Sequence, residues 1–163
     1  AGNVIGGGDF AENRIIPDCI RAAYKSQEII VRNPYSIRPY QHVLEPLYVY
    51  LMIAKAQCEN IEFAGYYNVG PDECDCITTG DLVDLFCKEW GNGQAWKNVC
   101  NQGPHEAQFL KLDCSKLKNT FGWGPRWQIT EAVVKTVEWA KVYEQNDSIV
   151  DCMEKQIRLF MLG

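Results

Sequence analysis

Six stretches of the chain predict helices, because apolar positions recur three and four residues apart or because helix-start residues precede them. These stretches are residues 13–25, 45–58, 79–90, 115–121, 130–143 and 148–162. In the second stretch, four apolar side chains share one side of the helix, and we expect that side to be buried. They are Leu47, Tyr50, Leu51 and Ala54.

Polar residues at the starts of these stretches predict helix caps, since their side-chain oxygens can accept hydrogen bonds from the first backbone N–H groups. We expect Asp9 or Asn13 to cap the first helix. Thr78 or Thr79 begins the third helix, and Asp113 is placed to cap the short fourth one.

Strands are predicted where short apolar or β-branched runs end at glycine, proline or asparagine. These runs are the segment before Gly6 and residues 28–32, 65–71 and 108–113. Strands separated by helices predict an α/β fold, or α+β for this piece alone, with helices around a small, mostly non-sequential sheet. No repeat or linker interrupts the chain, so we expect residues 1–163 to form a single domain.

Composition narrows the function classes. The 163 residues are 47% apolar and 23% charged, which is typical of a soluble globular domain. The net charge of −5 and the scattered distribution of the 16 basic residues argue against nucleic acid as a partner. No run of 18 apolar residues occurs, so no membrane span is predicted.

The eight cysteines are the unusual part of the composition, and their even number would permit disulfides. Most lie in apolar helical or strand patterns, where cysteine acts as a small hydrophobic residue. We therefore favour free thiols in a reducing cytoplasm. Cys74 and Cys76 lack a second pair of ligands, so no metal site is predicted.

Two segments carry the candidate chemistry. Residues 1–10 place three consecutive glycines after a short strand, which allows a tight turn and a close approach to a ligand. Residues 32–43 place Arg38 between two prolines, which we interpret as a stiff loop that holds a guanidinium against a diphosphate. Together they indicate a sugar-nucleotide site. Because the chain lacks a dinucleotide-binding glycine loop and does not begin with Met, we interpret it as a fragment.

The order of these motifs resembles the C-terminal portion of the extended short-chain dehydrogenase/reductase family, which includes NAD-dependent epimerases and dehydratases. The resemblance covers residues 1–143 and rests on Gly2-Asn3-Val4-Ile5-Gly6 and, more specifically, on residues 32–43. Residues 7–10 together with 14–18 are most similar to the CDP-glucose 4,6-dehydratase subgroup. Further matches are residues 67–71, 104–107, 110–116 and 117–127.

The resemblance implies substrate-binding roles for three residues on strand ends or loops. Arg38 and Asn68 would bind the diphosphate of the substrate. Asn3 would lie where the substrate phosphate meets the nicotinamide of the cofactor. Each also has a structural interpretation, which is a surface ion pair for Arg38, a turn for Asn68 and a strand-end cap for Asn3.

Four further residues are candidates by the same resemblance. Arg14, Ile16 and Pro17 would line the nucleotide pocket at a helix start, although the spacing of Ile16 alone indicates core packing. His105 would contact the ligand. His42, the other histidine, we interpret as a structural residue.

The resemblance implies that the parent protein is a lyase of deoxysugar biosynthesis. It would convert CDP-glucose to CDP-4-keto-6-deoxyglucose with a bound NAD, and it would act as a homo-oligomer. None of the eight tyrosines has lysine four places later, so the family's tyrosine-lysine pair and the other catalytic residues are expected upstream of this chain. We predict that the chain alone is inactive and, with its parent contacts missing, prone to self-association.

One departure from the family pattern concerns Gln108-Phe109, where related dTDP-glucose enzymes carry arginines, and beyond Tyr143 no motif matches. Two alternatives stay open. The parent could be another nucleotide-sugar dehydratase or epimerase of the family, or the chain could be a noncatalytic nucleotide-binding or protein-interaction module.

Overall fold

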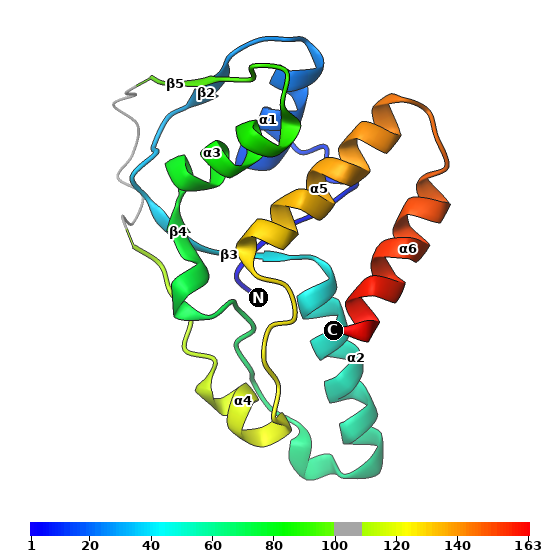
Figure 1. Cartoon of the computed structure of the whole chain (residues 1–163). Coiled ribbons are helices and arrows are strands. Elements are labelled where there is room, and N and C mark those ends of the chain that lie inside the picture. The colour runs from blue at the N-terminus through cyan, green and yellow to red at the C-terminus, as the bar shows by residue number, and fades with distance from the viewer. Residues whose placement is uncertain (100–108) are drawn as a thin grey trace.

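The computed structural model describes residues 1–99 and 109–163, in which helices surround two small sheets (Figure 1). The helices are α1 (Ile15–Tyr24), α2 (Leu44–Glu59), α3 (Thr79–Trp90), α4 (Ser115–Phe121), α5 (Ile129–Glu144) and α6 (Ile149–Leu162), with short 3-10 turns η1 (Ile61–Phe63) and η2 (Glu73–Asp75). The strands are β1 (Asn3–Ile5), β2 (Ile29–Val31), β3 (Ile37–His42), β4 (Cys76–Thr78) and β5 (Trp96–Asn98). The expected α/β class and all six expected helices are confirmed.

Strand β3 is the centre of the larger sheet, whose order is β1-β3-β4. Its first half, Ile37 to Pro39, pairs with β4 in the antiparallel direction, and its second half pairs with β1 in parallel. The expectation of a loop here was therefore wrong, because Arg38 lies on a strand. Pro39 is tolerated since it stands where pairing passes from one neighbour to the other, so its missing N–H is not needed for both ladders.

The second sheet pairs β2 with β5 in parallel, joining Ile29 to Trp96 and Val31 to Asn98. Strand β2 was expected from its β-branched run. Strand β5 was not, because its three residues lie in a polar stretch without apolar alternation.

Two expected strands are absent as regular elements. Residues 65–71 form none, although the Val69 carbonyl accepts hydrogen bonds from the backbone N of Gly2 at 2.8 Å and from Gln41 Nε2 at 3.0 Å. In 109–113 only Phe109 forms an isolated bridge, to Ile37, while Gln108 lies outside the described residues. Both segments make too few backbone pairs to form a ladder.

The main core lies where α1, α3 and α5 pack together against the strands, with α6 on the outer side of α5 (Figure 1). Fully buried residues from three helices, Cys19, Phe86 and Ala132, form part of it. A smaller cluster around Val49 and Leu117 joins α2 to α4. The seven cysteines in the described residues are free thiols, as expected.

The buried side of α2 is not the side that the sequence indicated. Glu45, Pro46 and Val49 are buried, whereas the four residues expected inside are all exposed. They are Leu47, Tyr50, Leu51 and Ala54. The helix is apolar on two sides, so the pattern could not distinguish which of them packs.

The helix caps are partly as expected. Thr78 and Asp81 form a reciprocal capping box at α3. At α4 the N-cap is Cys114 rather than Asp113, although Asp113 Oδ1 accepts from the Ser115 N–H at 2.9 Å. The expectation for α1 was wrong, since its N-cap is Arg14 and no side chain caps it. Asn13 has a left-handed backbone, φ 62°, and its side chain is engaged elsewhere.

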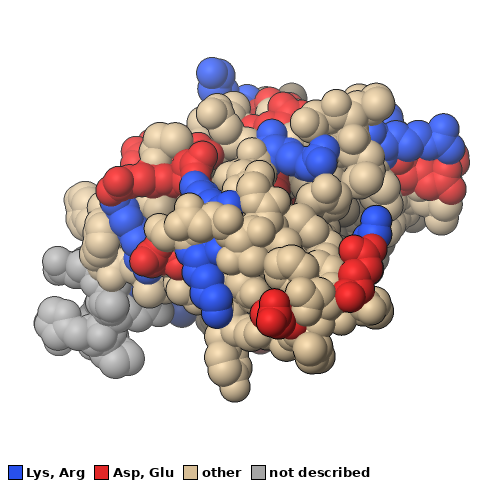
Figure 2. Space-filling view, turned by 90° about the horizontal axis from the view of Figure 1, so that it is seen from below, with Lys and Arg blue, Asp and Glu red and all other residues tan. Residues whose placement is uncertain are grey.

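Charged side chains of both signs are interspersed over the face seen in Figure 2, with uncharged areas between them. Within residues 1–99 and 109–163, no helix combines the length and hydropathy that crossing a bilayer requires.

Candidate functional site

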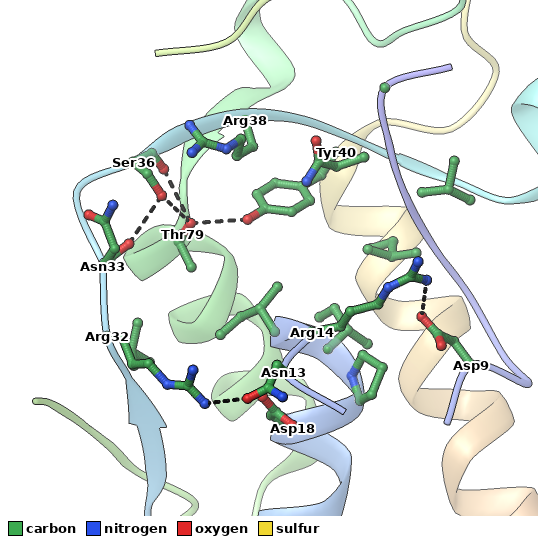
Figure 3. Close-up of a pocket in the computed structure, with 18 of the residues that line it drawn as sticks. Asp9, Asn13, Arg14, Asp18, Arg32, Asn33, Ser36, Arg38, Tyr40 and Thr79 are labelled. Atoms are coloured by element: carbon green, nitrogen blue, oxygen red, sulfur yellow. Dashed lines mark hydrogen bonds and ion pairs between the residues drawn. The ribbon is translucent and has the colours of Figure 1, made fainter. Parts of the chain in front are cut away.

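An open pocket of about 620 Å³ lies where the C-terminal end of β1, the start of α1, the segment after β2 and the start of β3 meet (Figure 3). The structure brings five of the seven expected site residues to its wall. These are Asn3, Arg14, Ile16, Pro17 and Arg38. Residues of segments 1–10 and 32–43 therefore line one pocket.

Three arginines line this pocket, and each has a partner. Arg14 pairs with Asp9 at 3.1 Å, Arg32 donates to Asn13 Oδ1 at 2.7 Å, and Arg38 donates to the Ile37 carbonyl at 2.9 Å. Guanidinium groups carry a permanent charge and several fixed donors, which suits phosphate oxygens. Arg32 was missed as a site residue, although it is the first residue of segment 32–43, on which the family resemblance rests.

The start of α1 adds a second source of positive potential. Ile15 and Ile16 lie at the pocket wall, no side chain caps the helix, and Pro17 has no N–H. The first N–H groups of a helix lack intrahelical partners and carry the positive end of its dipole. This end therefore favours an anionic group, while the nearly buried Ile16 serves both the core and the pocket wall.

A cluster of hydroxyl groups forms the opposite end of the pocket (Figure 3). Thr79 Oγ1 lies 2.9 Å from Ser36 Oγ and 3.0 Å from the Tyr40 hydroxyl, and all three residues are buried. The cluster gives this end neutral donors and acceptors. The sequence held no signal for it, because isolated serine, threonine and tyrosine residues form no pattern.

The two carboxylates of the wall are both paired. Asp18 forms an ion pair with Arg21. Although burial raises the pKa of the Asp9 carboxyl, hydrogen bonds from the Ala11 N–H and from Arg14, with the nearby arginine charges, lower that pKa overall. With its cations, helix start and hydroxyls, the pocket is built to bind an anionic, hydroxyl-bearing ligand.

Two buried titratable residues lie beside the site without lining it. His42 is 2% exposed, and its Nδ1 accepts from the Leu44 N–H at 3.3 Å. Burial and the charge of Lys135 lower the pKa of His42 to about 4. Burial raises the pKa of Glu45, whose Oε1 accepts two backbone N–H groups of the turn before α5, both at 2.8 Å.

Two expected site residues lie elsewhere. Asn68 is not part of the pocket wall, and its side-chain amide donates to the Asp113 carbonyl at 3.0 Å. His105 lies outside the described residues. No group of three or more His, Cys, Asp or Glu side chains in residues 1–99 and 109–163 is arranged to hold a metal ion.

Comparison with known proteins identifies a relative in sequence and several proteins of similar fold. No protein-family model matches the sequence. A CDP-glucose 4,6-dehydratase of Salmonella typhimurium is 43% identical over 162 residues, which are 99% of this chain and 45% of that protein. The chain is homologous to part of a nucleotide-sugar dehydratase. It spans less than half the length of that relative.

Solved structures of the same fold are more distant in sequence. A UDP-glucose 4-epimerase of Stenotrophomonas maltophila with bound NAD and formylated UDP-arabinopyranose has a TM-score of 0.74 at 15% identity, over 89% of this chain and 47% of the epimerase. A dTDP-glucose 4,6-dehydratase of Bacillus anthracis in complex with NAD gives 0.70 at 16% identity, over 88% and 44%. These similarities show that the chain has the fold of one part of an extended Rossmann-type protein.

Proposed function

We propose that residues 1–163 form a single sugar-nucleotide-binding domain of an NAD-dependent CDP-glucose 4,6-dehydratase. The observation that carries this proposal is the pocket with three arginines and an uncapped helix start, in a chain that is 43% identical to such an enzyme. The free thiols among the described residues fit a reducing compartment, the cytoplasm.

Within the pocket, Arg38 on β3 and Arg14 at the start of α1 bind the phosphates of the nucleotide sugar, because both residues line the wall. Asn3, on β1, lies at the junction of the substrate phosphate and the cofactor. Ile16 and Pro17 contact the nucleotide. Asn68, which is not part of the pocket wall, and His105, which lies outside the described residues, complete the substrate site in the parent protein.

When bound in the parent protein, NAD would supply a reversible hydride acceptor, so that oxidation at C4 of the glucose, loss of water across C5 and C6, and reduction at C6 would leave no net redox change. This chain holds neither the tyrosine-lysine pair nor a glycine loop for the cofactor. Its residues bind and orient the diphosphate and the sugar. We place Asn3 near the cofactor, and the parent acts as a homo-oligomer.

Calorimetric titration of the chain with CDP-glucose, dTDP-glucose and GDP-mannose tests the binding role. We expect CDP-glucose to bind and Arg38→Ala to abolish that binding. Arg158→Ala, at an exposed residue of α6 paired with Glu154, is the matched control and should bind normally. Preference for another nucleotide would favour a different dehydratase or epimerase, and binding of none would refute the role for the chain alone.

A second assay tests the expected inactivity. The chain should not turn over CDP-glucose in the presence of NAD, since the proton-transfer residues are outside it. Measurable product would show that the chemistry resides in these 163 residues. The chain could also be fused to the part of its 43% identical relative that it does not cover. If the chain binds CDP-glucose but neither the chain nor the fusion turns it over, a noncatalytic module is favoured.

A further inference from the structure

Asp9 lies directly against one of the cations of the pocket. Its Oδ2 is 3.1 Å from Arg14 NH1, and Figure 3 shows the two side chains pointing toward each other, with the hydroxyl cluster at the other side of the pocket. Both residues line the pocket. In this arrangement the Asp9 carboxylate forms an ion pair with a guanidinium that would otherwise be available to a ligand.

The carboxylate is held in place, whereas the guanidinium is not. Asp9 Oδ1 accepts from the Ala11 N–H at 3.0 Å, and Arg21 donates to the carbonyls of Phe10 and Ala11 at 3.1 and 3.0 Å. The Asp9 side chain is 31% exposed and that of Arg14 is 67% exposed. A long, exposed arginine can therefore turn away from a carboxylate that its own loop fixes.

An exposed ion pair of this kind is easily exchanged. Such pairs contribute little free energy, while a phosphate offers more charge and more acceptor oxygens than a carboxylate. Once the phosphate has taken Arg14, Asp9 faces an anion across a short distance. Like charges at that separation repel, so Asp9, after losing its partner Arg14, also weakens the complex with the phosphate.

We propose that Asp9 is a built-in competitor for Arg14, which occupies this arginine in the empty pocket and limits the affinity for a phosphate-bearing ligand. The proposal rests on the proposed function, since it assumes that a nucleoside diphosphate enters this pocket. It assigns Asp9 to positioning, because it acts on the ligand through Arg14. Its consequence is easier release of the ligand after it has been bound.

The test is calorimetric titration of CDP into the wild-type chain and into Asp9→Asn at low ionic strength. The amide keeps an oxygen that can accept from the Ala11 N–H while the charge is removed. We expect binding to become about two- to fivefold tighter, with a gain that shrinks as salt is added. Unchanged or weaker binding would overturn the proposal. Weaker binding would in addition indicate that Asp9 is itself a ligand contact.

Two further variants separate this mechanism from a general charge effect. Asp18→Asn removes another carboxylate of the pocket wall, one that pairs with Arg21, and should give a smaller gain. In an Arg14→Gln background, Asp9→Asn should give a clearly smaller gain, because only the direct repulsion between Asp9 and the phosphate is then relieved. An equal gain from Asp18→Asn, or an undiminished gain without Arg14, would refute the competition. Thermal unfolding of each variant confirms that it is folded.

Pyrophosphate as a second probe distinguishes the two proposals. If pyrophosphate binds and CDP does not, the nucleotide function is refuted. The comparison of wild type with Asp9→Asn could then still be made with pyrophosphate. If neither probe binds to the wild-type chain or to Asp9→Asn, both proposals are refuted. If both bind but Asp9→Asn changes nothing, only the competition is refuted.

Discussion

Acidification should unfold this protein partly through one residue, His42. Its ring is 2% exposed and stands edge-on to Trp127 at 4.9 Å, and its Nδ1 accepts from the Leu44 N–H. The Nε2 atom is buried and has no partner among the described residues. A second proton would therefore place a charge where water cannot reach it, beside the cationic Lys135.

The size of the effect follows from the two pKa values. The pKa of His42 falls from 6.5 to about 4 on folding, so the unfolded chain takes up the proton first. The stabilisation is complete above the unfolded pKa and is lost as the pH falls toward the folded one. Linkage gives a loss of about 2 kcal/mol at pH 5 and about 3 kcal/mol at pH 4, relative to pH 8.

The assay is urea unfolding of the wild type and of His42→Asn at a series of pH values. Asparagine places an oxygen near the position of Nδ1 but does not titrate. The packing lost with the ring is independent of pH, and the carboxylates and His105 titrate in both proteins. The free-energy difference between the two proteins should therefore shrink by about 2 kcal/mol from pH 8 to pH 5. A difference that stays constant over this range would refute the reasoning.

Two further perturbations probe packing. Gly7→Ala should destabilise the fold by about 1–3 kcal/mol in urea unfolding, because a Cβ there would lie 2.1 Å from the ring of Trp139, whereas Gly124→Ala, with open space around it, should change little. Equal effects at the two glycines would contradict this. Leu51→Glu, at a side chain 73% exposed on α2, should reduce self-association in light scattering, whereas Tyr66→Glu, at an exposed residue outside the helix, should not. Association that is insensitive to Leu51→Glu would exclude this face.

The helices were predictable because their signals extend over several turns, and the capping box at Thr78 marks one start to the residue. The short strands were not, since three residues such as Trp96–Asn98 are too few to show a period. Arg38 was assigned to a loop because proline normally excludes a central strand. That rule fails where the two ladders of β3 meet at Pro39.

The pocket was predictable where a motif reached it and not elsewhere. Arg38 was found because prolines flank it in a recognisable segment, and Arg14 was found through the family resemblance. The hydroxyl cluster around Thr79 escaped notice, because its members come from separate elements and meet only in the folded chain. The side of α2 that packs was likewise decided by its surroundings, since both sides are apolar.

The strand pairings also bear on how fast the chain folds. Every ladder joins residues that are distant in sequence, such as Asn3 with Tyr40 and Ile29 with Trp96. The chain must lose the entropy of closing these long loops before the pairs begin to stabilise it. We therefore expect the helices to form well before the sheets. During that interval the apolar sides of α2 are available to neighbouring molecules, so the yield on refolding should fall as the protein concentration rises.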